Sequence, residues 1–222
     1  MNEKITVITG SNRGIGLEFA RIYAERGDDV IATCRQSSPE LDALGVTVHS
    51  GLDVTSEDSI STLASTLGNR VIQRLVLNAG VLSRESLDAL DLDRIRQQFE
   101  VNALGPLRIA HALRQNLKAG SRIAIITSRM GSVEDNTSGS MYGYRMSKAA
   151  VNMAGRSLSH DLRDEGVAVG LLHPGYVRTG MTGGNGNWNA DEAAAALVSR
   201  IDEITLDNSG TFRHANGDSL PW

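Results

Sequence analysis

The feature that most constrains the fold of this chain is a regular alternation of short apolar runs with segments of helical periodicity. At residues 123–126 four consecutive side chains are apolar, which is typical of a strand with both faces buried. Helices on both sides of a parallel sheet bury strands in this way. We therefore predict an α/β fold with a doubly wound parallel sheet of six or seven strands and helices on both faces.

The expected elements follow this alternation along the whole chain. Strands are expected at residues 5–9, 30–33, 46–49, 74–77, 122–127 and 167–172. Helices are expected near residues 14–25, 38–44, from 55 or 56 onward, 87–104, 106–118, 144–164 and 191–202.

Composition excludes several kinds of function. The 222 residues carry a net charge of −4, and no basic run could follow a nucleic-acid backbone. Cys34 is the only cysteine and the five histidines lack metal-binding spacing, so we expect no disulfide and no metal site. No apolar stretch approaches the roughly 18 residues that cross a bilayer. We expect a single domain, residues 1–222, that is cytoplasmic and binds neither nucleic acid nor membrane.

A glycine-rich turn, residues 9–16, closes the first apolar run and opens the first helix. Glycines allow a tight turn and close approach of a ligand, and the N–H groups and dipole of a helix N-terminus favour phosphate. Leu17 and Glu18 stand where a P-loop needs Lys and Ser or Thr, which argues against ATP or GTP hydrolysis. The turn predicts a phosphate-containing ligand, although a purely structural turn could share its glycines.

The end of the second strand distinguishes between dinucleotides. An acidic residue there binds a ribose 2′-hydroxyl, whereas an arginine accommodates a 2′-phosphate. This run ends at Arg35, and Arg13 lies inside the glycine turn as a second guanidinium, the group that best matches phosphate geometry. We therefore expect NADP(H) in preference to NAD(H). The alternative is that Arg35 is a solvated loop residue. We interpret Cys34 beside it as a small buried hydrophobe.

Tyr144 and Lys148 are four residues apart, so a helix places them on one face. An ammonium there can stabilise a phenolate and lower the pKa of Tyr144 from its reference of about 10. The phenol would then be able to donate a proton to a carbonyl oxygen at neutral pH. The spacing alone does not establish this role, because many surface helices carry such a pair.

Further motifs accompany these two in a fixed order: Leu52-Asp53-Val54, Asn78-Ala79-Gly80, Val101-Asn102, Thr127-Ser128 and Pro174-Gly175-Tyr176-Val177-Arg178-Thr179. Together they cover nearly the whole chain, which resembles the short-chain dehydrogenase/reductase superfamily. Residues 144–150, 173–179 and 217–222 are similar to its C-factor and sniffer-type carbonyl reductase group. The resemblance implies a Rossmann-like fold.

The resemblance also implies a catalytic set of four residues. Tyr144 would be the general acid and base, Lys148 would bind the nicotinamide ribose and tune the tyrosine, and Ser128 would hydrogen-bond the carbonyl oxygen. Asn102 would hold a water that passes protons from Lys148 to solvent. Two alternatives stay open. Ser128 could be only a turn residue at a strand end, and Asn102 could bond only to backbone at a helix irregularity.

A cofactor site is implied in the same way. Asp53 would receive the adenine amino group, Asn78 would lie under the adenosine ribose, and Thr179 would contact the nicotinamide carboxamide. Asp53 could instead cap the helix that follows it. The residues expected to bind the cofactor are Gly10, Ser11, Asn12, Arg13, Gly14, Ile15, Gly16, Arg35, Asp53, Val54, Asn78, Ala79, Gly80, Tyr144, Lys148, Pro174, Gly175, Val177 and Thr179.

One residue departs from the family pattern, and one segment lies where the family binds substrate. Leu77 stands where the family usually has a first asparagine before Asn78, which changes strand packing but leaves Asn78 available. Residues 181–189, rich in glycine, lie where such proteins keep a substrate lid, although they could be an ordinary connector. Because little chain remains for substrate choice, we expect an open site with broad carbonyl specificity.

These observations lead to one expected function and one alternative. We expect an NADPH-dependent oxidoreductase that reduces an aldehyde or ketone to an alcohol by reversible hydride transfer. The alternative is an NADP(H)-binding signalling or redox-sensing protein with little turnover, and the intact set of four residues favours the enzyme. By analogy with the family, we expect a homodimer or homotetramer that packs through residues 106–118 and 144–164.

Overall fold

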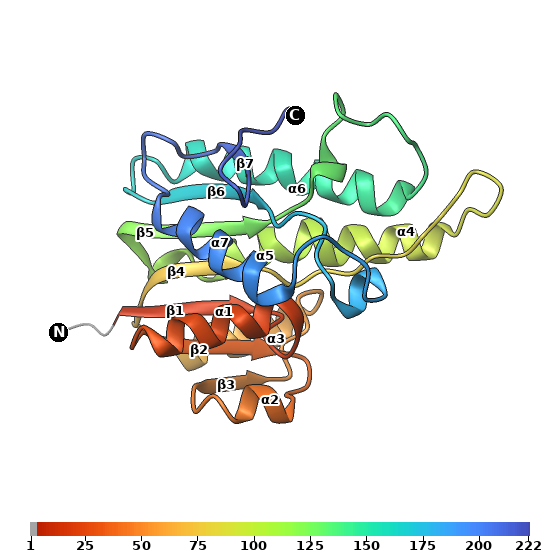
Figure 1. Cartoon of the computed structure of the whole chain (residues 1–222). Helices are drawn as coiled ribbons and strands as arrows, with labels where there is room; N and C mark the ends of the chain where they lie inside the picture. Colours follow the sequence, from red (N-terminus) through yellow and green to blue (C-terminus); the bar gives the residue numbers. More distant parts are fainter. Residues whose placement is uncertain (1–3) are drawn as a thin grey trace.

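In the computed structural model, which describes residues 4–222, seven strands form one parallel sheet in the order β3-β2-β1-β4-β5-β6-β7 (Figure 1). Residues 1–3 of the expected domain lie outside the described part. The strands are β1 (Lys4–Thr9), β2 (Asp29–Cys34), β3 (Thr47–Ser50), β4 (Val71–Leu77), β5 (Leu117–Ile126), β6 (Ala168–His173) and β7 (Phe212–His214).

The α-helices are α1 (Gly14–Glu25), α2 (Pro39–Asp42), α3 (Glu57–Leu67), α4 (Leu92–Phe99), α5 (Gly105–Ala112), α6 (Tyr142–Asp161) and α7 (Ala190–Asp202). A π-helix, Glu100–Leu104, joins α4 to α5, and short 3-10 helices lie at Arg114–Asn116, Arg129–Gly131 and Gly180–Thr182.

Helices cover both faces of the sheet, because successive strand residues point to opposite sides. On β5, Ile123 and Ile125 pack into a core with α3, α5 and α6, whereas Ala124 and Ile126 pack into a second core with α1 and α7. In Figure 1, α1 and α7 lie in front of the sheet and α3 and α5 lie behind it. The predicted doubly wound α/β fold is confirmed.

The direction of strand progression reverses next to β1, which has β2 on one side and β4 on the other. Ligands bind outside the carboxyl ends of the strands at such a reversal. The glycine turn after β1 and the loops after β2, β4 and β5 therefore meet at one edge of the sheet, toward the right of Figure 1.

Helix α6 lies close against this sheet because of a glycine. A Cβ atom on Gly155 would be 2.8 Å from Leu171 Cδ2 and 2.9 Å from Ile125 Cδ1. Both leucine and isoleucine belong to the central strands β5 and β6. This packing fixes the distance between α6, which carries Tyr144 and Lys148, and the strand that ends before Ser128.

The helices expected at residues 87–104 and 106–118 differ from those observed. Asp91 begins α4, because its Oδ1 accepts a hydrogen bond from Arg94 N at 3.0 Å, so residues 87–90 lie outside the helix. Further along, Leu117 already pairs with Ile72 in the sheet, and the second helix ends at Ala112. Strand β7, with three residues, is too short for its pattern to predict.

Candidate functional site

The glycine-rich turn joins β1 to α1 and leaves the start of α1 open to a ligand. Gly10 and Gly14 have φ values of 69° and 55°, which L side chains rarely adopt. In the described helix, Arg13 at the N-cap makes no side-chain capping bond, and the first turn carries no acidic residue. The first N–H groups of α1 therefore lack a side-chain acceptor and, with the helix dipole, favour an anion.

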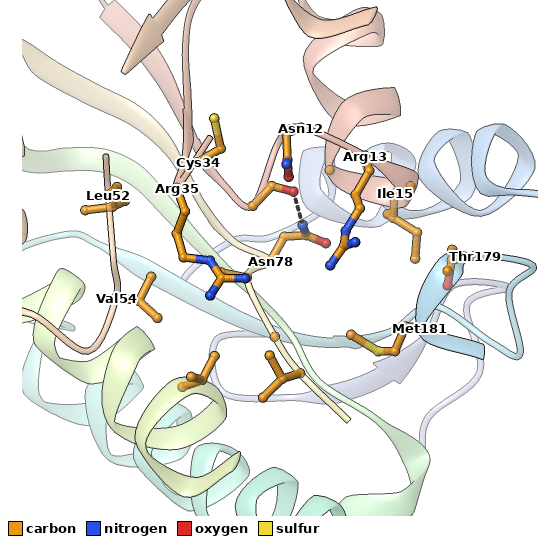
Figure 2. A pocket seen from close by; sticks show the side chains of 18 of the residues that line it. Asn12, Arg13, Ile15, Cys34, Arg35, Leu52, Val54, Asn78, Thr179 and Met181 are labelled. Atoms are coloured by element: carbon orange, nitrogen blue, oxygen red, sulfur yellow. Dashed lines mark hydrogen bonds between the residues drawn. The ribbon is translucent and has the colours of Figure 1, made fainter. Parts of the chain in front are cut away.

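Asn78, just after β4, holds this turn in place. Its Nδ2 donates hydrogen bonds to the carbonyl oxygen of Thr9 at 3.0 Å and to that of Gly10 at 3.2 Å, the bond drawn in Figure 2. A Cβ atom on Gly16 would lie 2.1 Å from the Gly10 oxygen and 2.6 Å from Asn78 Nδ2. Only glycine fits there, so Gly16 sets the distance between the first helix and the turn.

A cavity of about 660 Å³ opens at this edge of the sheet, within the range of about 300–1,000 Å³ typical of small-molecule sites. Many of the residues expected to bind a cofactor line it: Gly10, Asn12, Arg13, Gly14, Ile15, Gly16, Arg35, Asp53, Val54, Asn78, Ala79, Gly80 and Thr179. Its size and its open helix N-terminus suit an extended dinucleotide.

The cavity lining also includes residues that the sequence did not single out as cofactor contacts: Cys34, Gln36, Leu52, Val81, Gln97, Val101, Gly180 and Met181. Several of them are next to predicted contacts at strand ends, and this position in the sequence could have indicated that they line the cavity. Gln97 lies on α4 and Val101 on the π-helix, where no local pattern indicates contact with the cavity.

Some expected cofactor contacts lie outside this lining: Ser11, Pro174, Gly175, Val177, Tyr144 and Lys148. Ser11 is fully buried, and its N–H and hydroxyl bond to the carbonyl oxygens of Thr33 and Ile8 at 3.1 and 2.9 Å. Those contacts give it a structural role in the turn. Val177 is also buried, and it pairs with Trp188 at the base of the following loop.

Two arginines reach the same cavity from different elements. Arg35 follows β2 and Arg13 lies in the glycine turn, and Figure 2 shows their guanidinium groups entering the cavity from two sides. Neither arginine forms an ion pair with an acidic side chain in the part of the chain that the structure describes, residues 4–222. Both donors are thus available to a ligand phosphate.

Asp53 lines the cavity but also makes a local contact. Its Oδ1 accepts hydrogen bonds from Thr55 N and Thr55 Oγ1, at 2.9 and 2.8 Å. These bonds, with a smaller contribution from the Arg35 charge, hold the pKa of Asp53 below its usual value. Asp53 therefore forms a local turn with Thr55 but does not cap the following helix, because Ser56 is its N-cap and Ser56 Oγ accepts from Ser59 N at 3.3 Å. The second carboxylate oxygen of Asp53 remains available to the cavity.

Ser128, Tyr144 and Lys148 come together next to this cavity and are all buried. The Ser128 hydroxyl lies close enough to the Tyr144 phenol to influence its pKa. Lys148 Nζ lies 5.7 Å from the centre of the Tyr144 ring and donates to the Ile126 carbonyl oxygen at 3.0 Å. A phenol and a hydroxyl thus form a pair of possible donors, with an ammonium behind them.

A close contact between two elements fixes this arrangement. Ser128 begins the 3-10 helix Arg129–Gly131, and its Oγ accepts a hydrogen bond from Met130 N at 3.1 Å. A Cβ atom on Gly131 would lie 2.6 Å from the carbonyl carbon of Lys148. The 3-10 helix therefore packs directly on α6 and sets Ser128 opposite Tyr144.

Burial governs the pKa values in this group. Burial lowers the pKa of Lys148 to about 8 and raises the pKa of Tyr144, an effect that the nearby Ser128 hydroxyl partly opposes. The expected lowering of the Tyr144 pKa is therefore wrong for this structure. The reason is that removal from water disfavours the phenolate and also weakens the charge of the lysine that should stabilise it.

Asn102 lies in the π-helix and joins the loop after β4 to α6. Its Oδ1 accepts from Val81 N at 2.8 Å, and its Nδ2 donates to Val81 O at 2.8 Å and to Ser147 Oγ at 3.0 Å. Backbone bonding at a helix irregularity is thus present, but Asn102 does not bond only to backbone, because its Nδ2 also reaches the Ser147 side chain. π-bulges occur often at functional sites.

Gly80 connects the cavity to the buried group. It lines the cavity, and a Cβ atom on it would lie 3.2 Å from Asn102 Oδ1 and 3.9 Å from Lys148 Nζ. Only one residue therefore separates the end of the cavity from the lysine.

The expected lid, residues 181–189, is tied at its base. Arg178 N donates to Trp188 O at 2.9 Å, and Asn187 N donates to Tyr176 O at 2.7 Å. Met181, its first residue, and Thr179, just before it, line the cavity (Figure 2). The segment thus contacts the site at one end only.

Among residues 4–222, no helix is long and apolar enough to pass through a bilayer. Within the same range, no three His, Cys, Asp or Glu residues are grouped so that they could hold a metal ion.

Two proteins resemble the chain over two thirds or more of its length. A 1-hydroxy-2-glutathionyl-2-methyl-3-butene dehydrogenase of Rhodococcus sp. (strain AD45) is 43% identical, covering 97% of this chain and 98% of the relative. The C-signal protein of Myxococcus xanthus is 44% identical, covering 67% of this chain and 91% of that protein.

Solved structures show the same likeness. The carbonyl reductase Sniffer of D. melanogaster has a TM-score of 0.90 at 26% identity, and both chains are fully covered. A carbonyl reductase from Pseudomonas aeruginosa PAO1, in complex with NADP, has a TM-score of 0.87 at 33% identity, also over all of both chains. The family profile described as short chain dehydrogenase matches residues 4–190. The chain therefore belongs to the short-chain dehydrogenase family and is similar to its C-signal and sniffer-type members.

Proposed function

We propose that this protein is an NADP-dependent oxidoreductase that reduces an aldehyde or ketone to an alcohol and catalyses the reverse reaction. One observation carries the proposal: the buried pair of Ser128 and Tyr144, backed by Lys148, adjoins a dinucleotide-sized cavity. When bound, the cofactor supplies the hydride.

The residues of the cavity fit NADP(H). The N–H groups at the start of α1 would hold the pyrophosphate. Because Gly16 has no side chain, the glycine turn packs close against the start of this helix. Arg13 and Arg35 would bind the 2′-phosphate, because both line the cavity and a guanidinium matches phosphate geometry. The NADP bound by the similar carbonyl reductase of P. aeruginosa supports this choice.

Ser128 and Tyr144 would orient the carbonyl group. Each hydroxyl can donate a hydrogen bond to the carbonyl oxygen. Burial raises the pKa of Tyr144, so the phenol carries its proton at neutral pH and can give it to the oxygen as the alcohol forms. A protonated phenol is suited to reduction, whereas oxidation of the alcohol needs the phenolate and is favoured by higher pH.

Lys148 would hold the cofactor ribose and return the proton to Tyr144. Its pKa of about 8 leaves it mainly charged at neutral pH. One of its three N–H groups donates to Ile126 O, which leaves two for the ribose and for water. Asn102 would hold the water that connects Lys148 to solvent, since its Oδ1 lies near Gly80 next to that lysine.

The remaining expectations concern access and assembly. Residues 181–189 would close over bound substrate as a lid, because Met181 and the preceding Thr179 already line the cavity. Exposed apolar side chains, Leu107 on α5 and Met146 and Met153 on α6, support packing against a second copy in a homodimer or homotetramer. Light scattering after size exclusion measures the assembly, and a monomer would contradict it.

A substrate screen tests the proposed function. Purified protein is incubated with NADPH or NADH and a panel of aldehydes and ketones, and loss of reduced cofactor is followed by absorbance. The reverse panel, with NADP⁺, includes an alcohol of a glutathione thioether, because the Rhodococcus relative is named for such a substrate. We expect turnover of several carbonyl compounds with NADPH. NADPH binding without turnover of any compound would contradict the proposal and favour the signalling alternative.

A further inference from the structure

The helix that carries Tyr144 and Lys148 begins without a cap of its own. Met141, at its N-cap, has φ 54° and ψ 44°, and Ser140 before it also has φ 54°. Such left-handed conformations are disfavoured for residues other than glycine and persist only where neighbours hold them. Within the described helix, the N-cap makes no side-chain hydrogen bond and the first turn holds no acidic residue. Tyr144 lies in this first turn.

Glu85, from the loop between β4 and α4, supplies the missing acceptors. Its Oε2 accepts a hydrogen bond from Gly143 N at 3.3 Å, and its backbone oxygen accepts one from Met141 N at 2.8 Å. The side chain is 3% exposed, and it forms no ion pair with a lysine or arginine among residues 4–222. The Glu85 carboxylate thus contacts the positive end of the α6 dipole, which favours a negative charge.

The other carboxylate oxygen of Glu85 accepts from two further donors. Gln98 Nε2 donates to Oε1 at 2.9 Å, and the Ser83 hydroxyl donates to the same atom. Gln98 in turn accepts from Ser83 N at 3.0 Å. Because three donors converge on this carboxylate, the position requires a group that only accepts.

The same loop is attached to the site at its other end. Asn102 lies four residues after Gln98 and binds Val81 as Gln98 binds Ser83. Val81 lines the cofactor cavity. In the loop from the cavity to Glu85, every second residue, Val81, Ser83 and Glu85, is therefore held by hydrogen bonds. Glu85 contacts the first turn of α6, which contains Tyr144.

We infer that Glu85 is a positioning residue for Tyr144: it is a buried acceptor that holds the first turn of α6 in the orientation the reaction needs. This inference rests on the proposed function of Tyr144. Glu85 itself touches neither the cavity lining nor the Ser128 hydroxyl in the contacts described above. Glu85 therefore acts by positioning the Tyr144 phenol.

The test uses a reciprocal exchange of two side chains. Glu85→Gln keeps the size of the side chain, but it places an amide NH2 group, a donor, against the donors Gln98 Nε2 and Ser83 Oγ. In the double variant Glu85→Gln/Gln98→Glu, the new amide can donate to the new carboxylate and still accept from Gly143 N. The new carboxylate can still accept from Ser83 N. The Ser83 hydroxyl, which donates to Glu85 in the wild type, would instead accept from the new amide. The exchange therefore again pairs every donor with an acceptor, which the single change does not.

We expect Glu85→Gln to lower kcat by about 10- to 100-fold, the size of effect that a small misplacement of a reacting group produces. The Kd for NADPH should stay within about 2-fold, because the cavity lining is unchanged, and the double variant should recover most of kcat. Asp91→Asn is the control, since it alters a helix-capping carboxylate at the surface of neighbouring α4. It should leave kcat unchanged.

Three outcomes would overturn the inference. A Glu85→Gln enzyme with wild-type kcat, tested alongside an inactive Tyr144→Phe, would remove the positioning role and leave the proposed function intact. A double variant no better than the single one would show that hydrogen-bond complementarity is not the cause. Hydrogen exchange at Gly143 and Tyr144 reports on the turn without turnover. Unchanged exchange in Glu85→Gln would contradict the inference even if Tyr144 proved to have no catalytic role.

Discussion

The side chain of Asn102 pairs with both backbone groups of Val81, accepting from its N–H and donating to its carbonyl oxygen, each at 2.8 Å. The amide thus pairs with the Val81 backbone as a neighbouring strand would. Val81 follows the end of β4 and lines the cavity. The π-helix brings it there, 1% exposed.

We predict that Asn102→Ala lowers the free energy of unfolding by about 2–4 kcal/mol, because buried backbone donors and acceptors left without partners each cost about 1–3 kcal/mol. Activity should fall as well, since Val81 lines the site. Chemical denaturation measures the change. Asn208→Ala is the matched control: Asn208 also bonds backbone groups, Thr205 N and Glu203 O, but at the surface. An equal loss in both variants would contradict the special role of Asn102.

Gly16→Ala should abolish cofactor binding and destabilise the protein. The added methyl would lie 2.1 Å from the Gly10 oxygen, which is backbone and cannot move away without opening the turn. Gly180→Ala adds a methyl at another residue of the cavity lining where nothing lies within 4 Å, so it should be tolerated. NADPH titration by fluorescence compares the two. Normal binding by Gly16→Ala would refute the close packing of α1 on the turn.

Arg35→Asp should raise the KM for NADPH by about 10- to 100-fold, the equivalent of losing one hydrogen bond to a charged group, about 1.5–3 kcal/mol. The KM for NADH should change little, because NADH lacks the 2′-phosphate. Arg94→Ala, at the surface of α4, controls for loss of a positive charge. If both cofactors lost affinity equally, Arg35 would not be reading the phosphate.

The stability of the protein should fall steeply in mild acid because of His173. Burial, reinforced by the nearby His214, Arg129 and Lys148 charges, lowers the pKa of His173 to about 3, and its Nδ1 has no hydrogen-bond partner among the described residues. The unfolded chain takes up a proton near pH 6.5, but the folded chain does not until near pH 3. Stability is therefore full above pH 6.5 and is lost as pH falls toward 3.

Between pH 6.5 and 3, the free energy of unfolding should fall by about 1.4 kcal/mol for each pH unit because of His173. His173→Gln removes the titrating group, so its free energy of unfolding should depend less on pH, by about 2 kcal/mol between about pH 6.5 and 5. His111→Gln, at an exposed histidine, serves as the control. Parallel pH profiles for wild type and His173→Gln would show that His173 is not held neutral.

The sequence predicted the sheet and the position of the glycine turn at its edge well, because buried parallel strands leave clear apolar runs. Residues 123–126 indicated a two-faced strand, and the glycine turn indicated where a phosphate would lie. The spacing of Tyr144 and Lys148 placed both on one face of α6. Local pattern was sufficient for these features, since each depends on neighbours in the chain.

The features that were missed depend on contacts between distant segments. The π-helix at Glu100–Leu104 and the cavity contact of Gln97 arise from how α4 packs, which no local spacing records. The raised pKa of Tyr144 was also missed, because a helical spacing shows the nearby lysine but not the depth of burial. Glu85 looked like one acid in a polar loop until its carboxylate was seen at the start of α6.

The most direct test of the account is the rate of NADPH oxidation by Tyr144→Phe with the best carbonyl substrate of the wild-type protein. Removal of one hydroxyl keeps the ring in place, so NADPH binding should be retained. Because loss of general acid catalysis typically costs 10²- to 10⁴-fold, turnover should fall by at least about 100-fold. Turnover equal to that of the wild type would contradict the central claim that Tyr144 donates the proton.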